Sequence, residues 1–324
     1  MKKSGKKILV TGATGYVGKH LVDSLVENGY WVYALSRKRS LLFSNYQTVE
    51  LIIGDITELD ELPSNIDIIY HCAGTVHNIQ EMDRVNVRGT QRIVELALKL
   101  DCRLIYLSSA GIVGMTSDTV IDEHTVCHPH NAYELSKYRA EEIVVRAIKN
   151  GLRAHIVRPT TIFGGEKGTP RKDSFFQLVQ SMRTGTYKNI GNGRYNIIHI
   201  DEMVKALILL DETPVAYGGT YIISNSIQYR DMDILVKNLD PIVKKRTGTI
   251  PLPIANIASV ILSVVCWILR RKNPLTFSRL RALTNERVYV QSTVLQTLGL
   301  IPTMPIEDYI KKTCAAYIDQ HFLP

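Results

Sequence analysis

Near its N-terminus the chain reads Lys7-Ile8-Leu9-Val10-Thr11-Gly12-Ala13-Thr14-Gly15-Tyr16-Val17-Gly18, an apolar run followed by three glycines at intervals of three. Gly12 permits a tight turn, Gly15 lets the backbone approach a bound group, and Gly18 allows the next helix to pack near the strand. The N-terminus of that helix offers free N–H groups and a partial positive charge, which suit phosphate oxygens. The stretch predicts a strand, a glycine turn and a helix that seat a pyrophosphate; an ordinary strand-to-helix turn is the alternative.

Short apolar runs alternate with helix-length segments through the first half of the chain. The expected strands cover residues 8–10, 31–35, 49–53, 66–71, 103–107 and 154–157, and the expected helices cover 17–28, 82–100 and 133–150. Strands that alternate with helices predict a parallel sheet with helices on both faces. The predicted fold class is therefore α/β, a Rossmann-type doubly wound sheet.

The pattern changes after Arg158, where glycines and prolines cluster, among them Gly164, Gly165, Gly168 and Pro170. Helices are expected at 175–183 and 202–211, and a strand at 220–224. We expect a dinucleotide-binding domain over 1–160. A smaller substrate lobe over 161–324 is expected to interleave with the last sheet elements and to include the apolar segment 250–269.

Composition narrows the class of protein. The 324 residues are 45% hydrophobic and 22% charged, with a net charge of +8, which is ordinary for a globular enzyme and gives no reason to expect nucleic-acid binding. The five cysteines include no C-x-x-C pair, which favours a reducing, cytoplasmic location. Lys2 and Lys3 make the N-terminus basic, but the apolar run after it is too short for a signal peptide.

The second expected strand ends in Ser36 and Arg37, where NAD-binding proteins usually carry an acid for the ribose hydroxyls. A guanidinium matches the 2′-phosphate of NADP, so we expect NADP(H) to be preferred, with NAD(H) as the alternative. A basic turn that is only exposed to solvent, without a bound phosphate, is the alternative interpretation of these residues. Asp55 follows the third strand, and it can accept the adenine amino group or cap a helix over 57–62.

Tyr133 and Lys137 lie four residues apart, which places both on one face of a helix. An ammonium beside a phenol is expected to lower the pKa of the phenol and make it a better acid or base near neutral pH. Ser109 follows the fifth strand, whose carboxyl end faces the ligand crevice of a parallel sheet, and its hydroxyl can hold a substrate oxygen near the phenol.

Several motifs together resemble the extended short-chain dehydrogenases/reductases, which comprise the NAD-dependent epimerase/dehydratase enzymes and their 3β-hydroxysteroid-dehydrogenase-like relatives. In chain order the motifs are Gly12-x-x-Gly15-x-x-Gly18, Asp55-Ile56, His71-Cys72-Ala73-Gly74, Asn86-Val87-x-Gly89-Thr90, Ser108-Ser109, Tyr133-x-x-x-Lys137 and Arg158-Pro159. The resemblance runs from about residue 6 to about residue 225 and more faintly to the C-terminus.

The resemblance implies an enzyme that passes a hydride between a nicotinamide and a hydroxyl or ketone carbon. It implies Ser109 as the catalytic hydroxyl, Tyr133 as the acid/base, Lys137 as the ribose contact and Asn86 in support. The residues expected at the cofactor are Gly12, Thr14, Gly15, Tyr16, Val17, Gly18, Ser36, Arg37, Asp55, Ile56, Ala73, Gly74, Tyr133, Lys137, Pro159 and Ile162.

Some positions depart from the nucleotide-sugar members. Val113-Gly114 stands where many of them have Tyr-Gly, and the stretch from Gly191 to Asp201 lacks their Arg-Asp pair. A bulky substrate of the hydroxysteroid type therefore fits better. A nucleotide-sugar epimerase, dehydratase or 4-reductase, and a non-catalytic NADP(H) sensor, remain as alternatives.

A His/Cys cluster and a long uncharged stretch are two further features of the sequence. His124, Cys127, His128 and His130 cluster before Tyr133, but no fourth ligand has suitable spacing, so we expect polar loop residues at the cleft mouth and no metal. The uncharged stretch 247–269 lies between 244–246 and 270–272, both basic, and a helix is expected from Ile254. A polar stripe of Asn256, Ser259, Ser263 and Arg270 fits an interfacial helix through 254–269, and burial in the lobe or in a homodimer contact is the alternative.

Overall fold

The computed structural model describes residues 5–165, 173–212, 217–239, 248–268, 270, 280–281, 283–300 and 302–319. Lys2, Lys3, Gly168, Pro170, Leu269, Arg271, Lys272 and the basic run 244–246 lie outside these ranges. The strands are β1 Lys7–Thr11, β2 Trp31–Ser36, β3 Val49–Ile53, β4 Ile68–His71, β5 Arg103–Leu107, β6 Val120–Ile121, β7 Ala154–Pro159, β8 Thr161–Phe163, β9 Asn189–Ile190, β10 Arg194–His199, β11 Thr220–Ile223, β12 Asn225–Gln228, β13 Thr249–Ile250 and β14 Val288–Tyr289. The α-helices are α1 Tyr16–Glu27, α2 Ile79–Met82, α3 Gly89–Lys99, α4 Ala132–Lys149, α5 Ser174–Arg183, α6 Ile200–Glu212, α7 Tyr229–Asn238, α8 Leu252–Ile268, α10 Thr293–Thr297 and α11 Ile306–Asp319.

The main sheet confirms the predicted fold class. It has seven strands in the order β11-β7-β5-β4-β1-β2-β3, and each pair within it is parallel. Its order reverses at β1, because β2 and β4 lie on opposite sides of that strand. Thr11, at the end of β1, pairs with Leu35 on β2 and with His71 on β4. The carboxyl ends of the central strands therefore meet where a doubly wound sheet binds its ligand.

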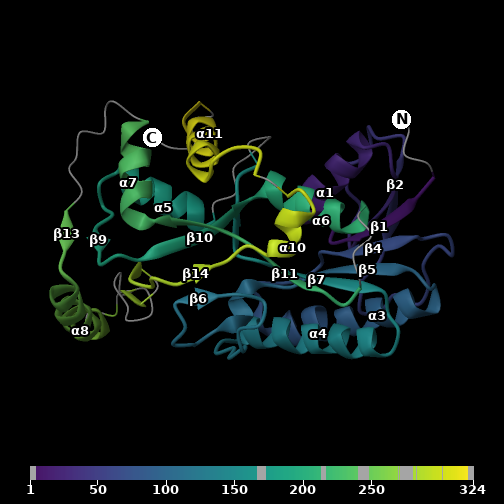
Figure 1. Cartoon of the computed structure of the whole chain (residues 1–324), viewed down its shortest axis with the longest axis horizontal. Coiled ribbons are helices and arrows are strands. Elements are labelled where there is room, and N and C mark those ends of the chain that lie inside the picture. The colour runs from purple at the N-terminus through teal and green to yellow at the C-terminus, as the bar shows by residue number, and fades with distance from the viewer. Residues whose placement is uncertain are drawn as a thin grey trace.

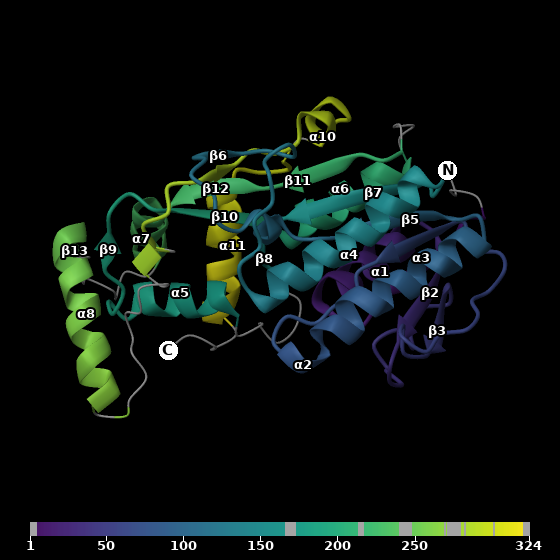
Figure 2. The same ribbon diagram turned by 90° about the horizontal axis from the view of Figure 1, so that it is seen from below.

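Helices cover both faces of this sheet (Figures 1 and 2). The apolar faces of α1 and α6 pack with β1 and β2 in one core cluster, which includes Leu21, Leu25 and Leu207. The apolar faces of α3 and α4 pack on the other side in a second cluster, which includes Ile93 and Val144. The glycine turn and the start of α4 are thus held by two separate layers of buried side chains.

A smaller lobe continues from the sheet. It contains the three-stranded sheet β12-β10-β8, and its core is formed largely by α5, α7 and α11. Two elements after residue 160 belong instead to the main layer, since β11 pairs with β7 and α6 packs on α1. The division into domains at residue 160 stays a prediction.

Three expected elements differ in the structure. The expected helix 82–100 consists of α2, a π-helix over Asp83–Arg88 and then α3. The helix over 57–62, which was one of the two alternatives for Asp55, does not form, because only a turn follows Asp55. Helix α8 begins at Leu252 rather than at Ile254, since Pro253 lies in the first turn, where a missing N–H leaves no helical bond unmade.

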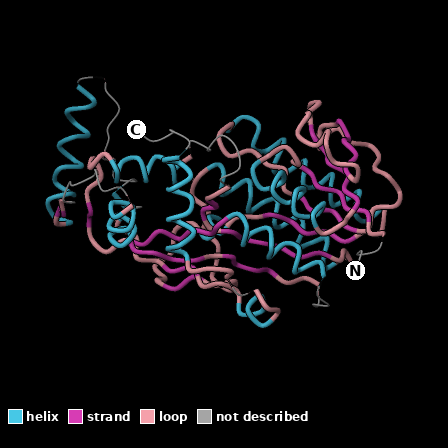
Figure 3. Tube along the Cα trace, turned by 90° about the horizontal axis from the view of Figure 1, so that it is seen from above, coloured by secondary structure: helices cyan, strands magenta, loops and turns pink. Residues whose placement is uncertain are grey.

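Helix α8 stands at the end of the molecule farthest from the N-terminal strands in all three overall views (Figures 1, 2 and 3). Ala255 on this helix packs with Ile190 of β9 and with Leu280. The expected polar stripe is partly wrong, because Ser259 is buried against the protein while Asn256 and Ser263 are exposed. None of the helices in the described ranges has the length and apolarity that crossing a bilayer requires.

Candidate functional site

The glycine turn has the geometry that its spacing predicted. Gly12 has a φ of +64°, and a Cβ there would lie 2.8 Å from the backbone of Ala73. A Cβ at Gly18 would lie 2.2 Å from the carbonyl oxygen of Gly12. Gly15 caps α1, whose first turn carries no acidic residue. The N-terminal N–H groups of α1 are therefore open to an anion, and no side chain fills the turn.

A cavity of about 620 Å³ runs from this turn into the smaller lobe. Its wall includes twelve of the residues expected at the site: Gly12, Gly15, Tyr16, Val17, Gly18, Ala73, Gly74, Ser109, Tyr133, Lys137, Pro159 and Ile162. The wall also includes residues of the lobe that no sequence pattern indicated, since they come from separate segments: Asp173, Ser174, Arg194, Tyr195, Asn196, Tyr229, Asn285 and Tyr289. The cavity is large enough for an extended ligand, and its glycine-lined end fits a pyrophosphate.

Ser109 and Tyr133 come together at the middle of the cavity. Ser109 follows β5 and caps a short 3-10 turn, accepting a hydrogen bond from Gly111 N at 3.1 Å. Tyr133 lies in the first turn of α4, which Asn131 caps by accepting from Glu134 N at 2.9 Å. Both side chains line the cavity, and the Ser109 hydroxyl is close enough to the phenol to influence its pKa. A hydroxyl and a phenol thus face the same space, which suits proton transfer to one substrate oxygen.

The expected effect of Lys137 on the phenol is wrong in this structure. Burial raises the pKa of Tyr133, and the nearby Ser109 hydroxyl only partly opposes that rise. The Lys137 ammonium instead donates to the carbonyl of Leu107 at 2.6 Å and lies 4.4 Å from the ring centroid of Tyr106. Burial lowers the pKa of Lys137 to about 8. The phenol is therefore held in its protonated form, and the ammonium is the group that titrates near neutral pH.

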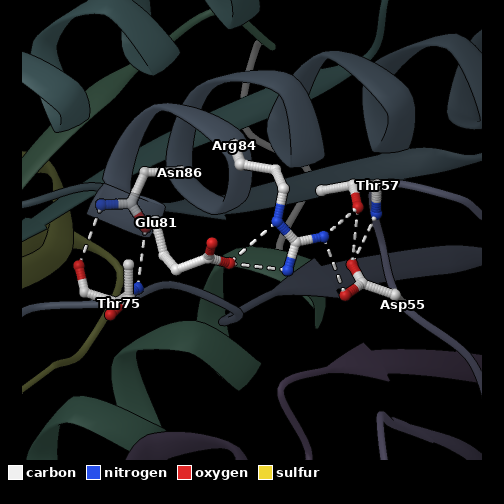
Figure 4. Close-up of polar contacts among 6 residues, drawn as sticks. All are labelled: Asp55, Thr57, Thr75, Glu81, Arg84 and Asn86. Carbon is white, nitrogen blue, oxygen red and sulfur yellow. Dashed lines mark hydrogen bonds and ion pairs between the residues drawn. The ribbon is translucent and has the colours of Figure 1, made fainter. Parts of the chain in front are cut away.

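Asn86 lies behind the cavity wall rather than in it. Its side chain accepts from Thr75 N at 2.8 Å and donates to the Thr75 carbonyl at 3.0 Å (Figure 4). It also donates to Ser136 Oγ at 2.9 Å, and Ser136 donates to the carbonyl of Tyr133 at 2.7 Å. The side chain of Asn86 thus ties the loop after β4 to the first turn of α4.

A buried ion pair supports the same helix, and the sequence analysis missed it. Glu141 and Arg158 are both less than a tenth exposed and form an ion pair at 2.5 Å. Ser108 donates to Glu141 Oε2 at 2.5 Å. Glu141 lies four residues after Lys137, so the face that carries Tyr133 and Lys137 could have suggested it. The pair fixes the end of β5 against α4, one residue before Ser109.

Five of the expected cofactor residues lie outside the cavity wall, one in the glycine turn after β1 and four at the ends of β2 and β3. The Thr14 and Ser36 hydroxyls lie 3.2 Å apart, and Arg37 is exposed. Ile56 is buried in the core against Gly89, so its side chain cannot reach a ligand. Asp55 completes this group.

Asp55 is already engaged within the protein (Figure 4). One of its oxygens accepts from Thr57 N at 3.0 Å and from Thr57 Oγ1 at 2.8 Å, and the other binds Arg84 at 3.1 Å. Burial alone would raise the pKa of Asp55, but these hydrogen bonds and the Arg84 charge outweigh it and lower the pKa. Arg84 in turn pairs with Glu81 at 2.7 Å. An adenine amino group would have to share the carboxylate with Arg84.

The His/Cys loop does not lie where the sequence suggested. His124, Cys127, His128 and His130 are all absent from the cavity wall as described. His130 pairs with Glu134 at 2.8 Å, and the backbone of His128 bonds to Val113 and Met115. In the ranges that the structure covers, no three His, Cys, Asp or Glu side chains gather as a metal site.

The chain is similar in sequence to known dehydrogenases and epimerases. A 3β-hydroxysteroid-dehydrogenase/decarboxylase of Arabidopsis thaliana is 24% identical over 95% of this chain, which spans 61% of the length of that protein. A UDP-glucose 4-epimerase of Vibrio cholerae is 26% identical, with 98% of this chain and 97% of the relative covered.

Among solved structures, a UDP-glucuronic acid 4-epimerase of Bacillus cereus in complex with NAD superposes with a TM-score of 0.73 at 19% identity. The alignment covers 98% of this chain and 99% of that one, and it confirms the fold. Residues 8–224, well over half of the chain, match the model of the NAD dependent epimerase/dehydratase family, and the chain belongs to that family.

Proposed function

We propose that the chain is an NAD(P)-dependent oxidoreductase that transfers a hydride between the nicotinamide and a hydroxyl or ketone carbon of a bulky substrate. The observation that carries this proposal is a single cavity whose wall includes both the glycine turn and the hydroxyls of Ser109 and Tyr133. When bound, the dinucleotide supplies or accepts the hydride. The protein supplies placement and a proton.

Tyr133 is proposed to donate its proton to the substrate oxygen during ketone reduction. Burial keeps this phenol protonated, which suits an acid in that direction. Ser109 is proposed to hydrogen-bond the same oxygen and so align it with the phenol. Lys137 is proposed to bind the ribose of the cofactor, and Asn86 to position α4 through Ser136.

The glycine turn is proposed to hold the pyrophosphate through Gly12, Gly15 and the N–H groups of Tyr16, Val17 and Gly18. Thr14 is proposed to contact the same phosphates from the rim. The walls beside the nicotinamide are proposed to be Ala73 and Gly74 on one side and the backbone of Pro159 and Ile162 on the other, since all four line the cavity.

The Tyr133→Phe substitution tests the chemistry. We expect turnover, followed by nicotinamide absorbance, to fall at least a thousandfold, because the acid is lost, while binding of NADPH stays within about threefold. Tyr46→Phe is a matched control, since its hydroxyl bonds to Asp23. Equal turnover in wild type and Tyr133→Phe would remove the proposal.

NADP(H) is proposed as the preferred cofactor, with NAD(H) as the weaker one. The support is Arg37, which is exposed at the end of β2 beside Ser36. A guanidinium there can pair with the 2′-phosphate. Arg37→Asp should reverse or flatten the preference in a fluorescence titration with NADPH and NADH, and a wild-type preference for NADH would contradict the assignment.

A nucleotide-sugar epimerase, dehydratase or 4-reductase is the second candidate, and it would use the same pair of hydroxyls. It is favoured by the near-complete coverage of the Vibrio cholerae epimerase and by Arg194, Asn196 and Asn285, polar residues on the lobe side of the cavity. A screen with sterols, lipid ketones and sugar nucleotides separates the candidates. Net reduction or oxidation of the nicotinamide with a sterol or lipid substrate supports the oxidoreductase, whereas interconversion of sugars without any net change of the nicotinamide supports the epimerase.

A non-catalytic NADP(H) sensor is the third candidate, and it would bind the cofactor without any turnover in this screen.

The enzyme is proposed to work in the cytoplasm at a membrane surface, which it contacts through residues 254–269. A homodimer built on the same residues is the competing arrangement.

A further inference from the structure

Helix α8 turns its apolar side chains to solvent. Seven isoleucines and valines are between 41% and 65% exposed: Ile254, Ile257, Val260, Ile261, Val264, Val265 and Ile268. At 100° per residue they fill a continuous arc of roughly 140° around the helix. We call this arc the α8 apolar face. Isolated exposed apolar residues are common, but seven on one helix face form a patch of the kind that marks an interaction site.

The face that α8 presents to the protein is small and partly polar. Ala255 is fully buried and Ser259 is 2% exposed, and both lie on the side that packs on Ile190 and Leu280. Ser263 donates to the carbonyl of Ser259 at 2.7 Å, so this hydroxyl is satisfied within the helix. The smaller side chains of α8 therefore pack against the protein, and its larger apolar side chains are exposed to solvent. The exposed surface of α8 carries few polar groups that would need hydrogen bonds from water.

The net positive charge of the chain is concentrated in the part of the sequence that contains this helix. Between Asp240 and Glu286 the sequence contains no acidic residue and eight basic ones: Lys244, Lys245, Arg246, Arg270, Arg271, Lys272, Arg279 and Arg281. These eight equal the whole net charge of +8, which leaves 31 basic and 31 acidic residues in the rest of the chain. A surface that covers α8 would therefore be expected to carry negative charge.

We propose that the α8 apolar face docks on a bilayer that contains anionic lipids, with α8 lying in the interface. This inference rests on the membrane contact proposed above and identifies anionic lipid as its partner. The 17 residues of α8 span about 25 Å, less than the ~30 Å of the hydrocarbon core, and basic sequence stands at both ends of the apolar stretch. That arrangement places the apolar side chains among the acyl chains and the cations at the headgroups of one leaflet.

The docked orientation brings the substrate lobe to the lipid. Leu280 packs with Ala255 of α8, and Asn285, five residues later, lines the cavity and accepts from the backbone N of Arg194 at 2.8 Å. The main sheet lies at the other end of the molecule (Figure 2). A bilayer-bound enzyme would thus hold the lobe end of its cavity near the membrane and the glycine turn farther from it.

Sedimentation of the full-length protein with vesicles tests the proposal. The wild type should sediment with vesicles that contain phosphatidylglycerol, and much less with vesicles of phosphatidylcholine alone. The double variant Ile257→Gln, Ile261→Gln should reduce binding at least tenfold. Leu98→Gln with Ile234→Gln is the matched control, because both residues are similarly exposed on α3 and α7 and their loss should leave binding unchanged.

Three results would overturn the proposal. They are a wild type that sediments with no vesicle, binding that does not depend on anionic lipid, and a wild-type dimer that the Ile257/Ile261 variant converts to a monomer without any vesicle binding. Tyr133→Phe should bind vesicles as the wild type does, and the Ile257/Ile261 variant should keep cofactor binding. Failure of the membrane contact is therefore distinguishable from failure of the proposed chemistry.

Discussion

At the scale of residues, the most costly group in the site is Lys137. Its ammonium is buried and donates a hydrogen bond to the carbonyl of Leu107. A cation in that position is destabilising unless it is compensated, which is why the pKa falls to about 8. A residue retained at such a cost is a candidate for function rather than for stability. Tyr133 lies on the same face of α4, and burial from water raises the pKa of its phenol.

Replacing Lys137 by Met should stabilise the protein at pH 7 and abolish activity. The pKa of this lysine is lower when folded than when unfolded, so the penalty is full below about pH 8 and disappears as pH rises toward 10.5. A shift of that size corresponds to roughly 3 kcal/mol. Denaturant unfolding of both proteins at pH 7 and near pH 10 measures it. A wild type that is the more stable protein at pH 7 would show that the ammonium is net stabilising.

At the scale of elements, one buried histidine links β1, β4 and the π-helix before α3. Thr90 donates its single hydroxyl proton to the Asn86 carbonyl at 2.6 Å, so it can only accept from His71 Nε2 at 3.0 Å. His71 Nδ1 then carries no proton and accepts from Thr11 Oγ1 at 2.7 Å. Thr11 itself accepts from Ala73 N at 3.2 Å. All the hydrogen bonds of this network can form only while His71 is neutral.

Acid should therefore loosen this junction. Burial lowers the pKa of His71 to about 3, below that of an unfolded histidine, so its contribution to stability is present above about pH 6.5 and is lost as pH falls toward 3. His71→Gln keeps donor and acceptor but does not titrate. Its unfolding free energy should fall less steeply than that of the wild type across this range. Identical slopes would exclude His71 as the acid-sensitive group.

The elements also show what the sequence could predict. Glycine spacing and apolar alternation were enough for β1, α1 and the sheet, because local sterics and burial determine them. They did not reveal that Arg84, from another segment, binds the carboxylate of Asp55. They also failed on α8, whose packed face depends on Ile190 and Leu280 rather than on its own polarity. Contacts between distant segments leave no mark in a local pattern.

At the scale of the whole molecule, the site is a junction between the sheet and the lobe. Ser109 and Tyr133 could be named from sequence because they follow strand and helix signals. Arg194, Tyr229 and Asn285 could not, since they reach the cavity from different parts of the lobe. Tyr16 crosses the junction, donating to the Gly164 carbonyl at 3.0 Å. Substrate selection therefore depends on how the lobe packs, which residue types alone do not encode.

The proposed chemistry requires that a dinucleotide seated on the glycine turn places its nicotinamide beside Tyr133. A crystal structure of the protein with NADP(H) measures this most directly. We expect a pyrophosphate on the backbone of Gly15, Tyr16 and Val17, with the nicotinamide C4 within about 5 Å of the Tyr133 hydroxyl. A dinucleotide bound elsewhere, or a nicotinamide directed out of the cavity and away from Ser109 and Tyr133, would contradict it.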